Sequence, residues 1–349
     1  MSSALGWPAS DDFARSRLGW PSPGQESAAD PTGLNDQPDP DDEAGPDEAS
    51  PSKGSGEAMT VSRETSDDAE RIVSRETSGL AEPARPPAGA WPRPPARRVL
   101  TVANQKGGVG KTTTAVNLAA ALAQHDVRVL VIDLDPQGNA STAFSVAHHL
   151  GAPSVYEALI GARSLNDVIV AVENLPNLWC APATIDLAGA EVELVSVVAR
   201  ESRLRRALES VELDVDYIFI DCPPSLGLLT LNAMVAASEI LIPIQCEFYA
   251  LEGLSQLLNN VALVKSELNQ ALYVSTILLT MYDARTRLAD QVAEDVRTHF
   301  GSLVLEAVIP RSVRISEAPG FGQTVVTFDP ASRGARAYQA AAYDLASRA

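Results

Sequence analysis

Residues 99–113, VLTVANQKGGVGKTT, read as an apolar strand that runs into a glycine-rich loop and then into the start of a helix. The loop contains three glycines, Gly107, Gly108 and Gly110. Because glycine carries no side chain, successive backbone N–H groups of such a loop can turn inward around phosphate oxygens. Lys111 can reach the β- and γ-phosphates of a nucleotide, and the hydroxyl of Thr112 can ligate Mg²⁺. The stretch therefore predicts a nucleotide-phosphate site, with the positive end of the following helix on the same anion.

A second lysine in the loop departs from the general phosphate-loop pattern. In G-x-x-x-x-G-K-[ST] the first glycine would fall at Gln105, and the next residue of this chain is Lys106. Since Lys111 already serves the phosphates, Lys106 needs a separate explanation. A flexible turn is the simpler interpretation of a glycine-rich stretch, but the strand before the loop and the Lys-Thr pair after it favour phosphate binding.

From residue 98 onward, apolar runs alternate with stretches of helical spacing. The apolar runs cover residues 99–103, 127–132, 178–181, 217–220, 240–244, 273–279 and 304–309. Helical spacing marks residues 111–124, 194–208, 251–268 and 288–300. Strands that alternate with helices place ligands at the carboxyl ends of a parallel sheet. We expect an α/β fold, a P-loop NTPase-like, mostly parallel twisted sheet with helices on both faces, preceded by a disordered N-terminal tail.

Composition divides the chain near residue 97. Residues 1–97 hold 14 of the 24 prolines and 9 of the 22 glycines, and they carry 18 acidic against 9 basic residues. Half of the formal net charge of −18 therefore lies in this segment. Such a segment cannot bury enough apolar surface to offset chain entropy. We expect a disordered acidic Pro/Gly-rich tail over residues 1–97 and one α/β domain over residues 98–349.

Two short repeats lie in the expected tail. Leu-Gly-Trp-Pro occurs at residues 5–8 and 18–21, where an exposed tryptophan can anchor a protein partner, with coincidence as an equal alternative. Val-Ser-Arg-Glu-Thr-Ser occurs at residues 61–66 and 73–78. Its first five residues can be encoded GTT TCA CGT GAA AC, which reads the same on the opposite strand. The second repeat is interpreted either as a DNA palindrome written in the coding sequence or as ordinary duplication.

The cysteines and the apolar runs bear on the compartment. Cys180, Cys222 and Cys246 are far apart and form no C-x-x-C pair, which argues against a disulfide scaffold and fits a reducing cytoplasm. No apolar run reaches the length of a membrane span, and the acidic N-terminus is unlike a signal peptide. In so acidic a chain, contact with nucleic acid requires a local basic patch.

Acidic residues follow two of the expected strands. Asp133 and Asp135 come after the run 127–132, and on an extended segment both side chains point the same way, toward the phosphate loop. Asp133 could hold a Mg²⁺-bound water, and Asp135 could orient the attacking water. The run 217–220 ends in Asp221, which has the form of a Walker B acid. Solvated turn carboxylates are the simpler alternative.

Five segments together resemble one family. They are KGGVGKTT at 106–113, DLDPQGN at 133–139, IDCPPSLGLLTLNA at 220–233, QCEFYALEGLSQLL at 245–258 and IPRSVRISEAPGFGQ at 309–323. In order and spacing they closely resemble the ParA/Soj chromosome-partition ATPases, which belong to the deviant Walker A group with MinD and the nitrogenase iron protein. The resemblance covers about residues 98–349 and leaves the tail outside.

The resemblance implies roles for the matching residues. Lys106 matches the signature lysine, which in this family crosses a dimer interface to the phosphates of the other subunit, so that two subunits sandwich two ATP molecules. Asp135 matches the acid needed for hydrolysis, with Lys106 and Lys111 as the other catalytic residues. The implied ATP-binding residues are Lys106, Gly107, Gly108, Gly110, Lys111, Thr112, Thr113 and Pro310. The implied Mg²⁺ site consists of Thr112, Asp133 and Asp221.

The resemblance also implies partners. ATP-bound dimers of the family bind double-stranded DNA without sequence preference, and a ParB-like centromere-binding protein stimulates their weak ATPase and releases them. DNA contact is attributed to basic residues that match Arg285 and Arg314. Arg287 would strengthen that patch, whereas Arg311 is open between DNA and the nucleotide pocket. We expect a cytoplasmic, nucleoid-associated protein that segregates chromosome or plasmid origins.

Other proteins of this fold fit the chain less well. A MinD-like membrane ATPase should end in a basic amphipathic helix, whereas residues 337–349 are alanine-rich and weakly charged. An iron–sulfur carrier would need cysteine companions for Cys222. The alternative that stays open is a nucleotide-switched polarity or scaffold ATPase, which would bind a polar scaffold protein through its N-terminal tail.

Overall fold

The computed structural model describes residues 85–247 and 250–348, in which eight strands form one twisted sheet. The strand order is β3-β4-β2-β5-β1-β6-β7-β8, and all neighbours are parallel except β3 and β4. The strands are β1 (Arg98–Val102), β2 (Val129–Asp133), β3 (Val170–Ala171), β4 (Leu178–Ala181), β5 (Tyr217–Asp221), β6 (Glu239–Gln245), β7 (Tyr273–Tyr282) and β8 (Val304–Pro310). The predicted α/β fold is confirmed, and each of the seven expected apolar runs is a strand. The strand β3 was not expected from the sequence; it is only two residues long, and both residues are exposed.

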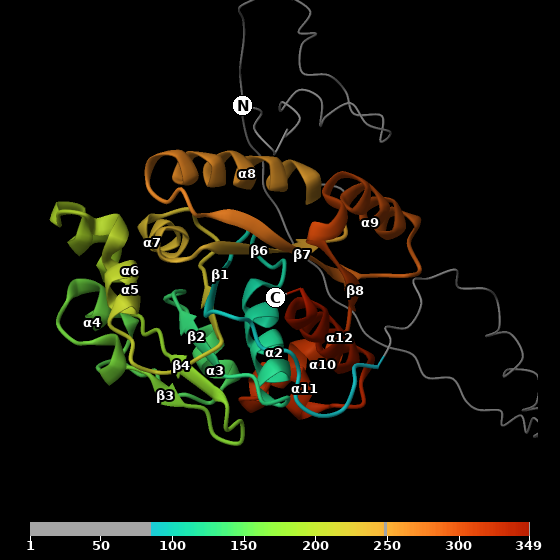
Figure 1. The fold of residues 1–349 in the computed structure, drawn as a ribbon, viewed down its shortest axis with the longest axis horizontal. Coiled ribbons are helices and arrows are strands. Elements are labelled where there is room, and N and C mark those ends of the chain that lie inside the picture. Colours follow the sequence, from blue (N-terminus) through green and yellow to red (C-terminus); the bar gives the residue numbers. More distant parts are fainter. Residues whose placement is uncertain (1–84, 248–249, 349) are drawn as a thin grey trace, which may run out of the picture. The chain divides into compact units, whose positions relative to one another are not determined.

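Helices cover both faces of the sheet, with α2 and α12 on one face and α7, α8 and α9 on the other (Figure 1). The helices are α2 (Lys111–Ala123), α3 (Asn139–Ala143), α4 (Val155–Ile160), α5 (Leu187–Glu193), α6 (Arg203–Glu209), α7 (Leu228–Ala236), α8 (Ala250–Glu267), α9 (Arg287–Phe300), α10 (Val313–Glu317), α11 (Val325–Phe328) and α12 (Arg333–Ser347). None of these described helices combines the length and the apolar character that crossing a membrane requires.

One expected helix is wrong. The spacing predicts a single helix over residues 194–208, whereas the structure has two 3₁₀ turns there, Leu194–Ser196 and Arg200–Ser202, and α6 begins only at Arg203. Val197 is extended, and Ala199 has a φ of +54°, in the left-handed region. Because a right-handed helix cannot pass through either conformation, the apolar spacing of this segment serves separate short turns.

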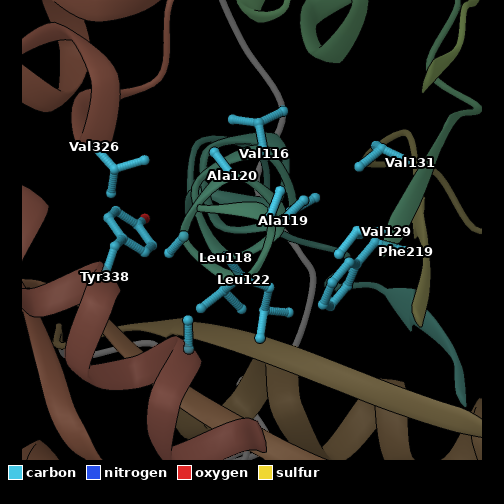
Figure 2. Packing of buried hydrophobic residues seen from close by; sticks show 14 of the residues in the cluster. Val116, Leu118, Ala119, Ala120, Leu122, Val129, Val131, Phe219, Val326 and Tyr338 are labelled. Atoms are coloured by element: carbon cyan, nitrogen blue, oxygen red, sulfur yellow. The ribbon is translucent and has the colours of Figure 1, made fainter. Parts of the chain in front are cut away.

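Helix α2, which follows the phosphate loop, is enclosed by a large apolar core. Its alanines let neighbouring elements approach closely, and Leu118 and Leu122 are fully buried. Around it lie Val129 and Val131 of β2, Phe219 of β5, Val326 of α11 and Tyr338 of α12 (Figure 2). A helix that is packed on every side gives the loop before it a fixed platform.

Residues before β1 form a strap across the C-terminal end of α2. Trp91 is 4% exposed and stacks on His125, with ring centroids 3.9 Å apart and planes 7° from parallel. Its backbone N–H donates to the carbonyl of His125 at 3.1 Å, and Tyr343 of α12 meets its ring edge-on. The folded domain therefore begins N-terminal to residue 98, where the sequence analysis set its boundary. The two repeats of the expected tail lie outside the described residues.

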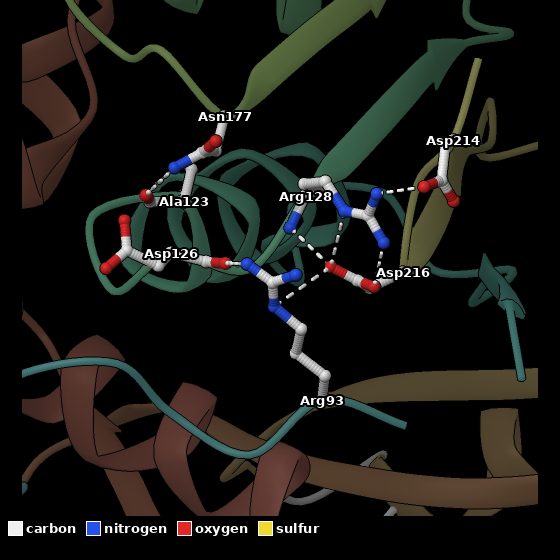
Figure 3. Close-up of polar contacts among 7 residues, drawn as sticks. All are labelled: Arg93, Ala123, Asp126, Arg128, Asn177, Asp214 and Asp216. Carbon is white, nitrogen blue, oxygen red and sulfur yellow. Dashed lines mark hydrogen bonds and ion pairs between the residues drawn. The ribbon is translucent and has the colours of Figure 1, made fainter. Parts of the chain in front are cut away.

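Polar contacts fix the strap as well (Figure 3). Arg93 donates to the carbonyl of Asp126 and lies 3.7 Å from the carboxylate of Asp216. The same carboxylate accepts hydrogen bonds of 2.8 and 3.2 Å from the guanidinium of Arg128. The strap is thus tied to the residues that enter β2 and β5.

Replacing Trp91 with alanine should lower the free energy of unfolding by about 3 kcal/mol, the lower end of the cost of truncating a buried tryptophan. Urea unfolding followed by circular dichroism measures the change. Trp20→Ala, in the expected disordered tail, is the matched control and should leave the midpoint unchanged. Equal midpoints for Trp91→Ala and the unaltered protein would show that the strap does not stabilise the domain.

Candidate nucleotide site

Three strands end level with one another at one edge of the sheet. Val102 of β1 and Asp133 of β2 both pair with Asp221, the last residue of β5. This register brings the loop after β1 beside the two carboxylates that end β2 and β5. The carboxyl edge of a parallel sheet is the usual ligand site of such folds.

The glycine-rich loop has the backbone shape that glycine permits. Gly108 and Gly110 have φ values of +75° and +88°, which other residues rarely adopt. Gly110 caps α2 without a side-chain hydrogen bond to the helix, so the N–H groups of the first turn are free to meet an anion. Thr112 and Thr113 lie half-buried in this turn.

Lys111 lies at the base of the loop and is 7% exposed. Its ammonium donates to the backbone carbonyl of Lys106 at 3.2 Å. Burial lowers the pKa of Lys111, and the carboxylates of Asp221 and Asp135 oppose that effect. A phosphate is a stronger acceptor for this ammonium than a peptide carbonyl, because a charged acceptor strengthens the bond.

Two residues that the sequence analysis missed hold the loop in place. The side-chain amide of Asn104 donates to the carbonyl of Pro243 in β6 at 2.8 Å, and its oxygen accepts the backbone N–H of Lys106 at 3.0 Å. The hydroxyl of Thr280 in β7 donates to the carbonyl of Val109 at 2.9 Å. The bonds to Pro243 and to Val109 join segments far apart in sequence, so no local sequence pattern predicts them.

Asp221 is a buried carboxyl group at the end of β5. Its side chain is completely buried, and among the described residues neither carboxylate oxygen has a hydrogen-bond partner. Burial, and then the nearby Asp133, raises its pKa well above the ordinary range, while Thr112 and Lys111 oppose the rise. An unpaired buried carboxylate is costly. A divalent cation beside Thr112 would remove this cost.

Asp133 is satisfied by its own chain. Its carboxylate accepts the backbone N–H of Ser141 at 2.9 Å and the hydroxyl of Ser141 at 2.7 Å. Burial raises its pKa to about 6, and the hydrogen bonds from Ser141 limit the rise. Asp133 thus fixes the start of α3 and faces any cation less openly than Asp221 does.

The set of carboxylates suits Mg²⁺ better than a metal held wholly by protein. In residues 85–247 and 250–348, no three His, Cys, Asp or Glu side chains converge on one point. Mg²⁺ is usually held by one or two carboxylates together with phosphates and water. Asp135 is 8% exposed, and its carboxylate accepts the backbone N–H of Gln137 at 3.0 Å, which forms the turn after β2.

Lys106 lies at the rim of this site and is 37% exposed. Its ammonium forms an ion pair with Glu247, which follows β6. Glu247 is not among the site residues predicted from the sequence. Pro310 ends β8, which lies three places from β1 in the strand order, so its assignment to the nucleotide pocket stays a prediction.

The two arginines assigned to DNA follow neighbouring strands. Tyr282 at the end of β7 pairs with Pro310 at the end of β8. Arg285 lies in the loop after β7, and Arg314 lies in α10, which follows β8. Both side chains are exposed, at 84% and 57%. The guanidinium of Arg285 donates to Asp283 at 2.7 and 2.9 Å, and these hydrogen bonds lower the pKa of Asp283 to about 2.

Arg314 is also paired within the chain. Its guanidinium lies 3.0 Å from Glu317 and 3.5 Å from Asp329. The sequence alone does not predict these two carboxylate partners. Exposed ion pairs are weak, at about 0–1 kcal/mol each, so a phosphate can replace either carboxylate at little cost.

Comparison with known proteins adds the family. A family model described as "AAA domain" matches residues 97–274. The sporulation initiation inhibitor protein Soj of Bacillus subtilis (strain 168) is 52% identical over 250 residues, which cover 72% of this chain and 98% of that protein. The chromosome partitioning protein ParA of Myxococcus xanthus (strain DK1622) is 51% identical over 251 residues, or 72% and 88% of the two chains.

Solved structures show the same fold. A structure described as cobyrinic acid a,c-diamide synthase from Mycobacterium smegmatis, with bound ADP and magnesium, is 39% identical and has a TM-score of 0.60 over 70% of this chain and 91% of that one. The septum site-determining protein MinD of Pyrococcus horikoshii OT3, complexed with Mg-ADP, is 25% identical and has a TM-score of 0.58 over 71% and 95%. From the sequence identity and the coverage of its relatives, this chain belongs to the Soj/ParA family of chromosome-partitioning proteins.

Proposed function

We propose that this protein is a weak ATPase that forms an ATP-sandwich dimer, binds DNA without sequence preference and segregates chromosome or plasmid origins. A ParB-like centromere-binding protein would stimulate its hydrolysis. One observation carries the proposal: the glycine-rich loop and Lys111 lie beside the buried, unpartnered carboxylate of Asp221 at the ends of adjacent strands. This edge suits a nucleotide phosphate with its metal. The similarity to Soj and ParA supports chromosome partition as the process that the nucleotide serves.

The residues of the edge divide the work of binding. The backbone of the loop and the ammonium of Lys111 bind the phosphates, and Thr112 with Asp221 holds Mg²⁺. Bound Mg²⁺ neutralises charge that develops on the β- and γ-phosphates. Asp133 contributes through water, because its own carboxylate is already bonded to Ser141.

Hydrolysis needs groups that a single subunit does not supply. Asp135 orients the attacking water, and Lys106 of the partner subunit neutralises phosphate charge across the interface. This division makes an isolated subunit a weak ATPase, because the second lysine arrives only with dimerisation. Mg-ADP or ADP with magnesium is bound in two of the structural relatives, which supports ATP and Mg²⁺ as ligands here.

Two other functions compete with chromosome partition. The name cobyrinic acid a,c-diamide synthase belongs to a structure that is 39% identical, whereas Soj is 52% identical and is covered over 98% of its length, so chromosome partition is favoured. A polarity or scaffold ATPase would share the nucleotide edge but would not require DNA. DNA retention in the presence of ATP and of ADP separates that alternative from partition.

Lys106→Ala should leave ATP binding within about threefold of the unaltered protein and abolish ATP-dependent dimers, because Lys106 acts across the interface. Fluorescent-nucleotide titration measures the binding, and light scattering on a sizing column measures the mass. Lys265→Ala, in the last turn of α8, removes the same charge elsewhere and should still dimerise. Dimers of normal affinity in Lys106→Ala would contradict the sandwich.

Asp135→Ala should lower ATP turnover at least about 100-fold, the usual contribution of a positioned base, and should trap the ATP dimer on DNA. Phosphate release and filter retention of DNA measure the two effects. Asp167→Ala, an exposed carboxylate in a 3₁₀ turn, serves as the control. Undiminished turnover in Asp135→Ala would rule out the assigned role.

Arg285→Ala/Arg314→Ala should abolish retention of double-stranded DNA with ATP. With two arginines per subunit, a dimer contacts about four phosphates, so the logarithm of the binding constant should fall against the logarithm of salt with a slope of about −3.6. Arg205→Ala/Arg206→Ala, two exposed arginines of α6, is the charge-matched control. A salt-dependence slope near zero for the unaltered protein would refute the assignment of these arginines to DNA binding.

A further inference from the structure

We propose that Glu247 is a positioning residue, which holds the ammonium of Lys106 on its own subunit and thereby sets how readily the ATP dimer forms. The inference rests on the proposed ATP-sandwich dimer. Its observation is the ion pair between the two side chains within one chain. Lys106 must leave this pair before it can reach a phosphate on the partner subunit.

The fold places the two residues face to face. β6 lies next to β1 in the sheet, and each strand continues into the loop that carries one partner of the pair. Asn104 bonds both to Pro243 of β6 and to the backbone of Lys106, so the two loops are tied together just before the pair. After β6, the backbone N–H of Glu247 donates to the carbonyl of Gln245 at 2.8 Å, which turns the chain sharply at this point.

Both polar ends of Lys106 are therefore engaged by its own subunit. Its carbonyl accepts the ammonium of Lys111, and its ammonium pairs with Glu247. A phosphate that binds Lys111 would release the carbonyl, but the pair with Glu247 would persist until a second nucleotide approaches. ATP binding and the release of Lys106 are then separate steps, and Glu247 governs the second.

The ion pair between Lys106 and Glu247 is strong enough to weaken dimerisation but too weak to prevent it. The side chains of Lys106 and Glu247 are 37% and 32% exposed, so solvent screens their attraction. Such pairs stabilise by a few tenths of a kcal/mol to about 1 kcal/mol, or about 2- to 5-fold in an equilibrium constant. A symmetric dimer releases two such lysines. Removing the carboxylate should therefore tighten dimerisation by about 4- to 25-fold.

The test compares Glu247→Gln with the unaltered full-length protein in Mg²⁺ and the non-hydrolysable analogue AMPPNP. Sedimentation gives the dimer dissociation constant, which should fall about 4- to 25-fold, and the gain should shrink at high salt, since screening weakens an exposed pair. Glu247→Asp keeps the charge and should resemble the unaltered protein. Glu306→Gln, an exposed carboxylate of β8, removes the same charge elsewhere and should have no effect.

A double variant separates positioning from a merely structural role. In a Lys106→Ala background, Glu247→Gln should change neither AMPPNP affinity nor the oligomeric state, because the residue acts only through Lys106. An unchanged or weaker dimer in Glu247→Gln, beside normal dimers of the unaltered protein, would overturn this role of Glu247 alone. Failure of the unaltered protein to dimerise with AMPPNP would overturn the proposed function and the role of Glu247 with it.

Discussion

A buried carboxyl group, that of Asp221, organises the nucleotide edge. Asp221 ends a strand that lies between β1 and β2, so strand register alone delivers it to the phosphate loop and to Asp133. Buried charges of one sign are tolerated when an opposite charge can reach them, and Lys111 supplies part of that compensation. The part of the Asp221 charge that Lys111 does not compensate favours a bound cation, such as the Mg²⁺ that accompanies a nucleotide. Nucleotide and metal are therefore bound more favourably together than either is alone.

The sequence predicted the structural features that depend on residues close together in the chain. The alternation of strands with helices predicted the sheet, and the spacing of Gly108, Gly110 and Lys111 predicted the loop. Both features depend on residues that are close together in the chain. Contacts between distant segments had no such signal: Thr280 on the loop is one example, and Glu247 on Lys106 is another. The expected helix over residues 194–208 failed because apolar spacing does not reveal the left-handed turn at Ala199.

Carboxylates are also present on the proposed DNA surface, beside both of its arginines. Arg285 is paired with Asp283 of its own loop, and Arg314 is paired with Glu317 of α10 and with Asp329 after α11. The region beyond β7 and β8 therefore presents oriented guanidinium groups whose charge is partly offset by carboxylates. An arginine already held in a fork-like geometry loses less side-chain freedom when a phosphate replaces the carboxylate. Ready exchange of a carboxylate for a phosphate suits the proposed cycle of DNA binding and release.

The strap at Trp91 and the phosphate loop lie at opposite ends of α2. It packs on the last turn of α2, while the phosphate loop precedes the first, and a helix of 13 residues spans about 20 Å. The strap around Trp91 therefore lies at the amino edge of the sheet, away from the edge where the proposed nucleotide and second subunit would meet. A fluorophore, a bead or a tether placed there could report on the domain while leaving its working edge unobstructed.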